Sequence, residues 1–268
     1  MSAPSPRSIA VCADDFGLDP NVNAGALILA GMGRLSAIAC MVGAPFWRRD
    51  AGELRRMDAA RVQSGLHVDL TEHPLDARMR RPLPEWILRS HAGAVDRAAL
   101  RREIDAQLDA FAGEMQRPPD FVDGHQYVHQ LPVVRDVLVQ ALVARNWKPW
   151  LRSTRRPAGL HSARACIIES LGASGLARRA RAHGLRQNRR LLGIYAFDGD
   201  AASYLRRLRD WVALAGDGDL LVCHPAAGWP AAAALPAARC HEYAVLAGAE
   251  AGELLEAAGV RIVPLPQH

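Results

Sequence analysis

Short apolar runs alternate with longer segments in which apolar residues recur at helical spacing along most of the chain. The apolar runs, which we interpret as buried strands, are residues 8–14, 35–43, 62–70, 120–125, 150–154, 191–197, 219–225 and 260–265. The segments with a helical pattern are residues 18–33, 44–60, 96–115, 132–145, 201–216 and 240–259. This alternation predicts a mostly parallel sheet with helices outside it, either an open doubly wound sheet or a closed (β/α) barrel.

Two regions lack a clean period. Residues 72–95 contain several prolines and are predicted to form a long loop or lid, whereas the Arg/Ala/Gly-rich residues 156–190 are predicted to form one or two short helices with exposed arginines. No low-complexity linker divides the chain, and 268 residues, half of them apolar, suffice for one substantial core. We therefore expect residues 1–268 to form a single domain.

Composition narrows the classes of function only slightly. The net charge is +5, and arginine supplies almost all of the positive charge because Lys148 is the single lysine. The sequence contains no recognised nucleic-acid-binding motif. We therefore expect no nucleic-acid partner. The five cysteines are scattered, which argues against a disulfide framework or a structural zinc knuckle. With no apolar leader and no apolar run long enough to cross a bilayer, the sequence predicts a soluble, cytoplasmic protein without a membrane span.

Ionisable side chains follow several of the predicted strands at the point where each strand ends. These residues are Asp14, Asp15, His67, Asp123, His125 and His224, with Arg152 inside the next strand after residue 125. Because the carboxyl ends of parallel strands meet at one edge of a sheet or barrel, these groups are expected to converge. A carboxylate and two imidazoles suit a divalent metal with open positions, and the second of two adjacent acids can then face a reacting water.

Each of these residues also has an ordinary structural interpretation. An Asp-Asp pair after a strand is most often a turn or helix-cap feature. His67 is compatible with a buried core histidine, and His224 with a strand end that has no further role. The i,i+4 spacing of His125 and His129 indicates a metal site only if that segment is helical.

Five segments taken together resemble a known family. They are "ADDFGLDPNVNAG", "GLHVDLTE", "DFVDGHQYVH" followed by "LP", "LRSTRRP" and "VCHP". In this order, between about residues 8 and 260, they resemble the YdjC-like carbohydrate deacetylases, also called the ChbG/HpnK type. The resemblance implies a distorted, TIM-like (β/α) barrel related to the NodB-type polysaccharide deacetylases. It also implies one divalent metal ion, Mg²⁺ or Zn²⁺, and hydrolysis of an N-acetyl group on the amino sugar of an oligosaccharide or glycolipid.

The resemblance also implies roles for individual residues. Asp15, His67 and His125 match the metal ligands of the family, and Asp14 matches its general base. In the same way His224 matches a general acid, and Arg152 is similar to an arginine that orients the base or stabilises charge.

The substrate end of the site departs from the family pattern. Many relatives have His-x-His-x-His where Tyr127 stands here between His125 and His129. We expect Tyr127, His129 and Trp86 to contact the substrate, which would be an N-acetylated amino sugar. Two other functions stay open, a metal-dependent glycosidase or phosphoesterase on the same scaffold and a non-catalytic carbohydrate-binding protein. Whether the chain forms a homo-oligomer is also open.

Overall fold

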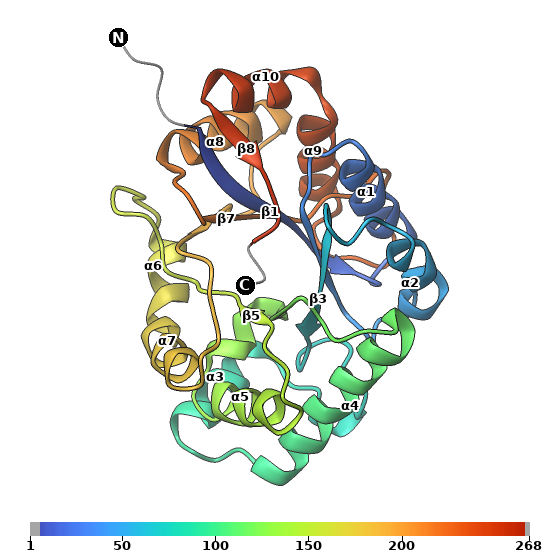
Figure 1. The fold of residues 1–268 in the computed structure, drawn as a ribbon, viewed down its shortest axis with the longest axis vertical. Helices are drawn as coiled ribbons and strands as arrows, with labels where there is room; N and C mark the ends of the chain where they lie inside the picture. The colour runs from blue at the N-terminus through green and yellow to red at the C-terminus, as the bar shows by residue number, and fades with distance from the viewer. Residues whose placement is uncertain (1–5, 266–268) are drawn as a thin grey trace.

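A single curled sheet of parallel strands forms the centre of the protein (Figure 1). In the computed structural model, residues 6–265 are described. The strands are β1 (Arg7–Phe16), β2 (Ala37–Cys40), β3 (Gln63–Val68), β4 (Phe121–Gly124), β5 (Trp150–Leu151), β6 (Leu191–Leu192), β7 (Leu220–Cys223) and β8 (Val260–Ile262). Their order is β5-β4-β3-β2-β1-β7-β6, with β8 paired to the first residues of β1, and every pair is parallel.

The sheet curls into a barrel that is incompletely closed between its edge strands β5 and β6. One isolated bridge, Leu151 to Gln187, joins the two edges within the described part of the chain. Beside it, the amide of Leu151 donates to the carbonyl of Arg186 at 2.7 Å, and the amide of Leu191 donates to that of Arg155 at 2.6 Å. The expected distorted (β/α) barrel is therefore confirmed, and the distortion lies at this seam.

Helices surround the curled sheet on its outside (Figure 1). They are α1 (Pro20–Gly31), α2 (Trp47–Arg55), α3 (Leu83–His91), α4 (Arg97–Met115), α5 (Val134–Ala144), α6 (Ala163–Ser170), α7 (Ala173–Ala182), α8 (Ala201–Leu214), α9 (Pro236–Ala247) and α10 (Ala249–Ala257), with short 3-10 segments at Ala77–Met79 and His125–Gln130. Helices α6 and α7 confirm the short helices predicted for residues 156–190. Within residues 6–265, no helix has the length and apolar character needed to cross a bilayer.

Two segments differ from the sequence prediction. Helix α3 lies in the region that was expected to be a loop. Its prolines do not interrupt it, because Pro82 is the N-cap and Pro84 lies in the first turn, where a missing amide hydrogen costs no helical hydrogen bond. The single helix expected over residues 240–259 is two helices. Gly248, with φ −68° and ψ 157°, has an extended backbone that ends α9 and begins α10.

The barrel interior below the site is filled by a few large rings placed among small residues. Ala10, Ala37 and Ala39 face inward from β1 and β2 and leave room for Phe121 and Trp150. These two rings are stacked, with centroids 4.5 Å apart and an angle of 17° between their planes. The Phe121 ring also covers Gly65 of β3, where an added Cβ would lie 2.4 Å from ring carbons. The absence of a side chain at residue 65 therefore lets β3 and β4 reach the site in register.

We expect Gly65→Ala to destabilise the protein by about 1–3 kcal/mol, because the new methyl group must displace a stacked ring in a filled interior. Gly113→Ala in α4 is the control, since a Cβ there meets nothing within 4 Å and replacing glycine inside a helix stabilises by about 0.5–1 kcal/mol. Urea denaturation of both variants measures the two effects. Equal midpoints for Gly65→Ala and the wild type would contradict the packing described here.

Candidate active site

The two adjacent carboxylates at the end of β1 point in different directions because the backbone turns sharply there. Asp15 has φ +69° and Gly17 has φ +108°, both in the left-handed region. The pairing of β1 with β2 shifts register between Ala13 and Phe16. A Cβ at residue 17 would lie 2.8 Å from the carbonyl oxygen of Met41, so this turn requires glycine. The turn directs Asp14 and Asp15 to separate partners.

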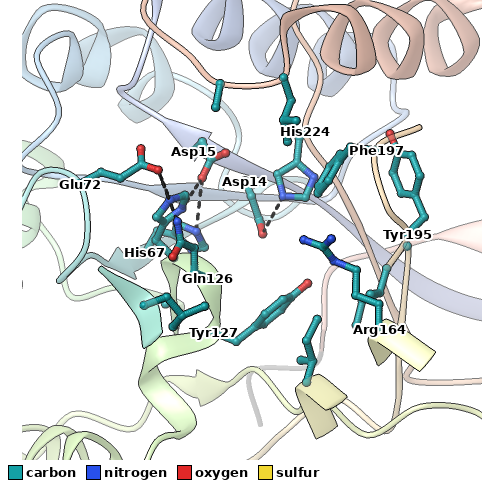
Figure 2. A pocket seen from close by; sticks show the side chains of 18 of the residues that line it. Asp14, Asp15, His67, Glu72, Gln126, Tyr127, Arg164, Tyr195, Phe197 and His224 are labelled. Atoms are coloured by element: carbon teal, nitrogen blue, oxygen red, sulfur yellow. Dashed lines mark hydrogen bonds and ion pairs between the residues drawn. The ribbon is translucent and has the colours of Figure 1, made fainter. Parts of the chain in front are cut away.

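Asp15, His67 and His125 form one cluster. Figure 2 shows two of them, Asp15 and His67, close together at the cavity. Asp15 Oδ1 lies 3.0 Å from His125 Nδ1 and 3.5 Å from His67 Nε2. One ligand atom from each of the three residues lies within 4.8 Å of the others. The opposite ring nitrogen of His67, Nδ1, is 2.6 Å from Asp123 Oδ1, which holds the ring so that Nε2 faces Asp15. One carboxylate and two oriented imidazoles form a donor set that fits a divalent metal.

Two further charged groups border this cluster. Arg239 of α9 donates from Nη2 to Asp15 Oδ2 at 2.5 Å, so one oxygen of Asp15 is held by a guanidinium and the other faces the imidazoles. Glu72 Oε1 lies 3.2 Å from His125 Nε2. Burial raises the pKa of Asp15, but Arg239 and His125 outweigh it and hold that pKa well below its usual value.

Asp14 is held by Arg152, which is fully buried. Both nitrogens Nη1 and Nη2 donate to the two Asp14 oxygens at 2.6 Å, and Nη2 also forms an ion pair with Asp123. Burial raises the pKa of Asp14, but the charge and hydrogen bonds of Arg152 outweigh it and lower the pKa to about 2. Asp14 is therefore an ionised carboxylate at neutral pH, with its plane fixed by a two-pronged contact.

A second pair, His224 and Glu242, lies beside Asp14. His224 Nε2 lies 3.9 Å from Asp14 Oδ2, and the His224 amide donates to Glu242 Oε2 at 2.6 Å. Tyr195 donates its hydroxyl to Glu242 Oε1 at 2.7 Å, and the same oxygen lies 4.0 Å from His224 Nδ1. Burial lowers the pKa of His224 to about 4 and raises the pKa of Glu242 to about 7. The imidazole is therefore neutral at pH 7.

These groups lie at one end of a cavity of about 680 Å³. Asp14, Asp15, His67, His125 and His224 all line it, whereas Arg152 lies behind Asp14 and does not reach it. The walls come from α3, α6, residues 193–197 and residues 234–235.

The structure brings together the six residues expected at the reacting centre, which are Asp14, Asp15, His67, His125, Arg152 and His224. It separates the three residues that were expected to contact the substrate. Tyr127 lines the cavity and extends into it in Figure 2. Two expectations are corrected. His129 is fully buried, with Nε2 3.0 Å from the carbonyl oxygen of Arg152. Trp86 is 1% exposed and donates its indole hydrogen to the carbonyl of Leu70 at 2.8 Å. Neither side chain lines the cavity.

Sequence reasoning missed Glu72, Arg239 and Glu242. Glu72 follows a strand by several residues, so it has no strand-end position that would mark it. Arg239 and Glu242 lie three residues apart on α9, and both are buried. An arginine and a glutamate on one face of an alanine-rich helix, just after the "VCHP" segment, was the available signal.

The chain is therefore a (β/α)-barrel protein with a metal-type donor cluster. A carboxylate, two imidazoles and a buried Arg–Asp pair lie at the carboxyl end of its sheet. The sequence profile described as "YdjC-like protein" matches residues 8–257. The chain belongs to this family.

Curated relatives and solved structures agree with that assignment. The chain is 33% identical over 170 residues to a human protein named carbohydrate deacetylase (59% of this chain, 50% of the human one) and 31% identical over 218 residues to its mouse namesake (72% and 67%). It is 32% identical over 136 residues to a chitooligosaccharide deacetylase of Yersinia enterocolitica (48% and 53%). The matches thus span about half to two thirds of these relatives.

The fold recurs in solved structures of low sequence identity. A protein of Enterococcus faecalis V583 named for cellobiose-phosphate cleavage is similar with a TM-score of 0.71 and 21% identity, covering 97% of this chain and 98% of that one. A family 4 carbohydrate esterase from Streptomyces lividans, solved with acetate, has a TM-score of 0.50 and 13% identity, covering 97% and 94%. At these identities the likeness concerns the fold.

The buried Glu242 predicts a pH dependence of stability. Burial raises its pKa from the usual 4.5 of a glutamate to about 7 in the folded protein. The folded state therefore favours the protonated carboxyl, and the contribution to stability is complete below pH 4.5 and is lost as pH rises through 7. We expect the wild type to lose about 2 kcal/mol relative to Glu242→Gln between pH 5 and pH 8. Urea denaturation at both pH values measures this difference, and an unchanged difference would show that Glu242 does not titrate in this range.

Proposed function

We propose that the protein is a metal-dependent hydrolase that removes the N-acetyl group from an amino sugar and releases acetate. The observation that carries the proposal is the position of a metal-type donor cluster, Asp15, His67 and His125, beside an ionised Asp14 and a neutral His224 at the end of one cavity. The names of the human, mouse and Yersinia relatives support the same reaction class.

Asp15, His67 and His125 would hold the metal, and two imidazole ligands favour Zn²⁺ over Mg²⁺, which prefers oxygen ligands. A bound divalent ion would polarise the acetamide carbonyl and acidify a water. His67 is suited to this role because Asp123 fixes its ring through Nδ1 and leaves Nε2 toward Asp15.

Asp14 would act as the base toward the attacking water. It is ionised at neutral pH, lines the cavity and is held in place from behind by Arg152. Arg152 is then a positioning residue, because it fixes the Asp14 carboxylate without reaching the cavity itself.

His224 would deliver a proton to the departing amine. Because its imidazole is neutral in the resting site, it must gain that proton during turnover. Asp14 Oδ2 lies 3.9 Å from His224 Nε2 and would hold the proton taken from water. The proton then passes from water to Asp14, from Asp14 to His224 and from His224 to the nitrogen as the C–N bond breaks.

The proposed setting of this reaction is a reducing, cytoplasmic compartment. The five free thiols, three of them buried, support it.

Three variants separate the proposed roles. We expect His67→Ala to lose both bound zinc and acetate release. Asp14→Asn is expected to keep zinc but to release acetate about 10²–10⁴-fold more slowly, since it removes only the base. His91→Ala, an exposed histidine at the end of α3, is the control and should keep both.

Zinc content by atomic absorption and acetate release from N,N′-diacetylchitobiose, with and without chelator, measure these outcomes. Equal zinc loss in His67→Ala and Asp14→Asn would contradict the division into ligand and base. Full activity of the chelated protein would contradict the metal requirement.

A further inference from the structure

Helix α6 presents one continuous face to the cavity, and that face has an unusual composition. Arg164, Ile167, Ile168 and Leu171 all line the cavity, and their spacing is that of a single helical stripe. Ile167 is 61% exposed. The stripe therefore begins with a guanidinium and continues with aliphatic side chains, of which Ile168 is buried, Leu171 half-buried and Ile167 exposed.

A second aliphatic wall comes from α3 and from the loop before α9. Leu83 and Ile87, one helical turn apart on α3, line the same cavity, and so does Leu235, which is 44% exposed. Leu18 and Ile194 add aliphatic surface closer to the reacting centre. Beyond the charged groups at one end and the rings of Tyr127, Tyr195 and Phe197, the cavity lining is thus mostly aliphatic.

The aliphatic walls from α6, from α3 and at Leu235 are poorly suited to a row of sugar rings. Every pyranose carries several hydroxyl groups, and each hydroxyl that leaves water without a new hydrogen bond costs free energy. Isoleucine and leucine side chains offer no such partners, whereas they stabilise a buried alkyl chain. The walls therefore favour a substrate whose portion beyond the amino sugar is apolar.

Arg164 places a positive charge in the otherwise aliphatic wall formed by α6. Within residues 6–265 its guanidinium has no ion pair or side-chain hydrogen bond, and it contacts the Phe197 ring at 5.6 Å from the centroid. By contrast Arg239, the other cavity-lining arginine, is paired with Asp15. Figure 2 shows the Arg164 guanidinium pointing into the cavity between Tyr127 and His224. A cation without a protein counter-charge, placed there, suits an anionic group on the ligand.

We propose that the substrate is amphiphilic, an N-acetylated amino sugar that bears an anionic oxygen group and is joined to an aliphatic chain. This inference rests on the proposed deacetylase function and names its substrate class. The acetamide lies at Asp14 and Asp15, the anionic group contacts Arg164, and the chain lies between α6 and α3 against Ile167 and Leu83.

Binding measurements test the two halves of the inference without requiring turnover. Asp14→Asn protein is titrated in a calorimeter with methyl and octyl N-acetyl-β-D-glucosaminide, with N-acetylglucosamine 1-phosphate and with N,N′-diacetylchitobiose, all below micelle-forming concentrations. We expect the octyl glycoside to bind at least about tenfold more tightly than the methyl glycoside, since each buried methylene contributes about fourfold before ordering costs. Its heat-capacity change should also be more negative. The 1-phosphate should bind about fivefold or more tighter than the methyl glycoside.

Matched variants assign these effects to the named side chains. Ile167→Gln should reduce the ratio of octyl to methyl affinity about tenfold, whereas Leu88→Gln, on α3 and 70% exposed outside the cavity lining, should leave the ratio unchanged. Arg164→Gln should abolish the preference for the 1-phosphate. Arg178→Gln on α7, an exposed arginine outside the cavity lining, should retain it.

The outcomes distinguish this inference from the function on which it rests. Equal binding of octyl and methyl glycosides, or tighter binding of the chitobiose, overturns the aliphatic assignment, while acetate release from the chitobiose by the wild type would leave the deacetylase function standing. Conversely, tight octyl binding with no acetate released from any of the four compounds would overturn the deacetylase function and keep the amphiphile site. A 1-phosphate preference that survives in Arg164→Gln overturns the anion assignment.

Discussion

The buried guanidinium of Arg152 connects the two halves of the site. It holds both oxygens of Asp14 and also pairs with Asp123, whose other oxygen fixes the His67 ring. Removing a cation from between two buried carboxylates would leave uncompensated charge, which costs about 3–5 kcal/mol in buried pairs. The orientation of the proposed base, Asp14, and that of one proposed metal ligand, His67, therefore depend on the same side chain. The position of that side chain depends in turn on β5, the two-residue strand directly before it.

Charge balance explains how two adjacent acids are tolerated at the end of β1. The repulsion is relieved first by protein cations, because Arg152 pairs with Asp14 and Arg239 pairs with Asp15. The two imidazoles share in this balance. Burial lowers the pKa of His67, but Asp123 and Asp14 outweigh it and raise that pKa to about 9. Asp15 and Glu72 likewise outweigh burial and raise the pKa of His125. A bound divalent cation would take the place of these protons, so the same carboxylates could be balanced by two imidazolium groups or by one metal ion.

Strand-end residues could be predicted from the sequence because two simple rules act together. Apolar runs mark the strands, and parallel strands bring their carboxyl ends to one edge, so Asp15, His67 and His125 could be expected to meet. Arg239 follows no such rule, since its position depends on how α9 packs across the barrel. The predicted substrate contacts of Trp86 and His129 were wrong for a related reason. Residue type suggested contact with a sugar, but only the packing of neighbouring segments decides whether a ring faces a cavity or the core.

The cavity walls come from the segments in which the hydrophobic pattern was hardest to interpret. In an ordinary surface helix the apolar stripe faces the core, so periodicity and burial agree. In α6 the stripe containing Ile167 and Leu171 faces a cavity, and in α3 the prolines obscure a helix that does the same. Apolar surface that folding leaves uncovered gives no stability to the isolated protein. Its presence beside a reacting centre is explained if a ligand covers it, and the weakness of the folding signal in these segments then follows from their role in binding.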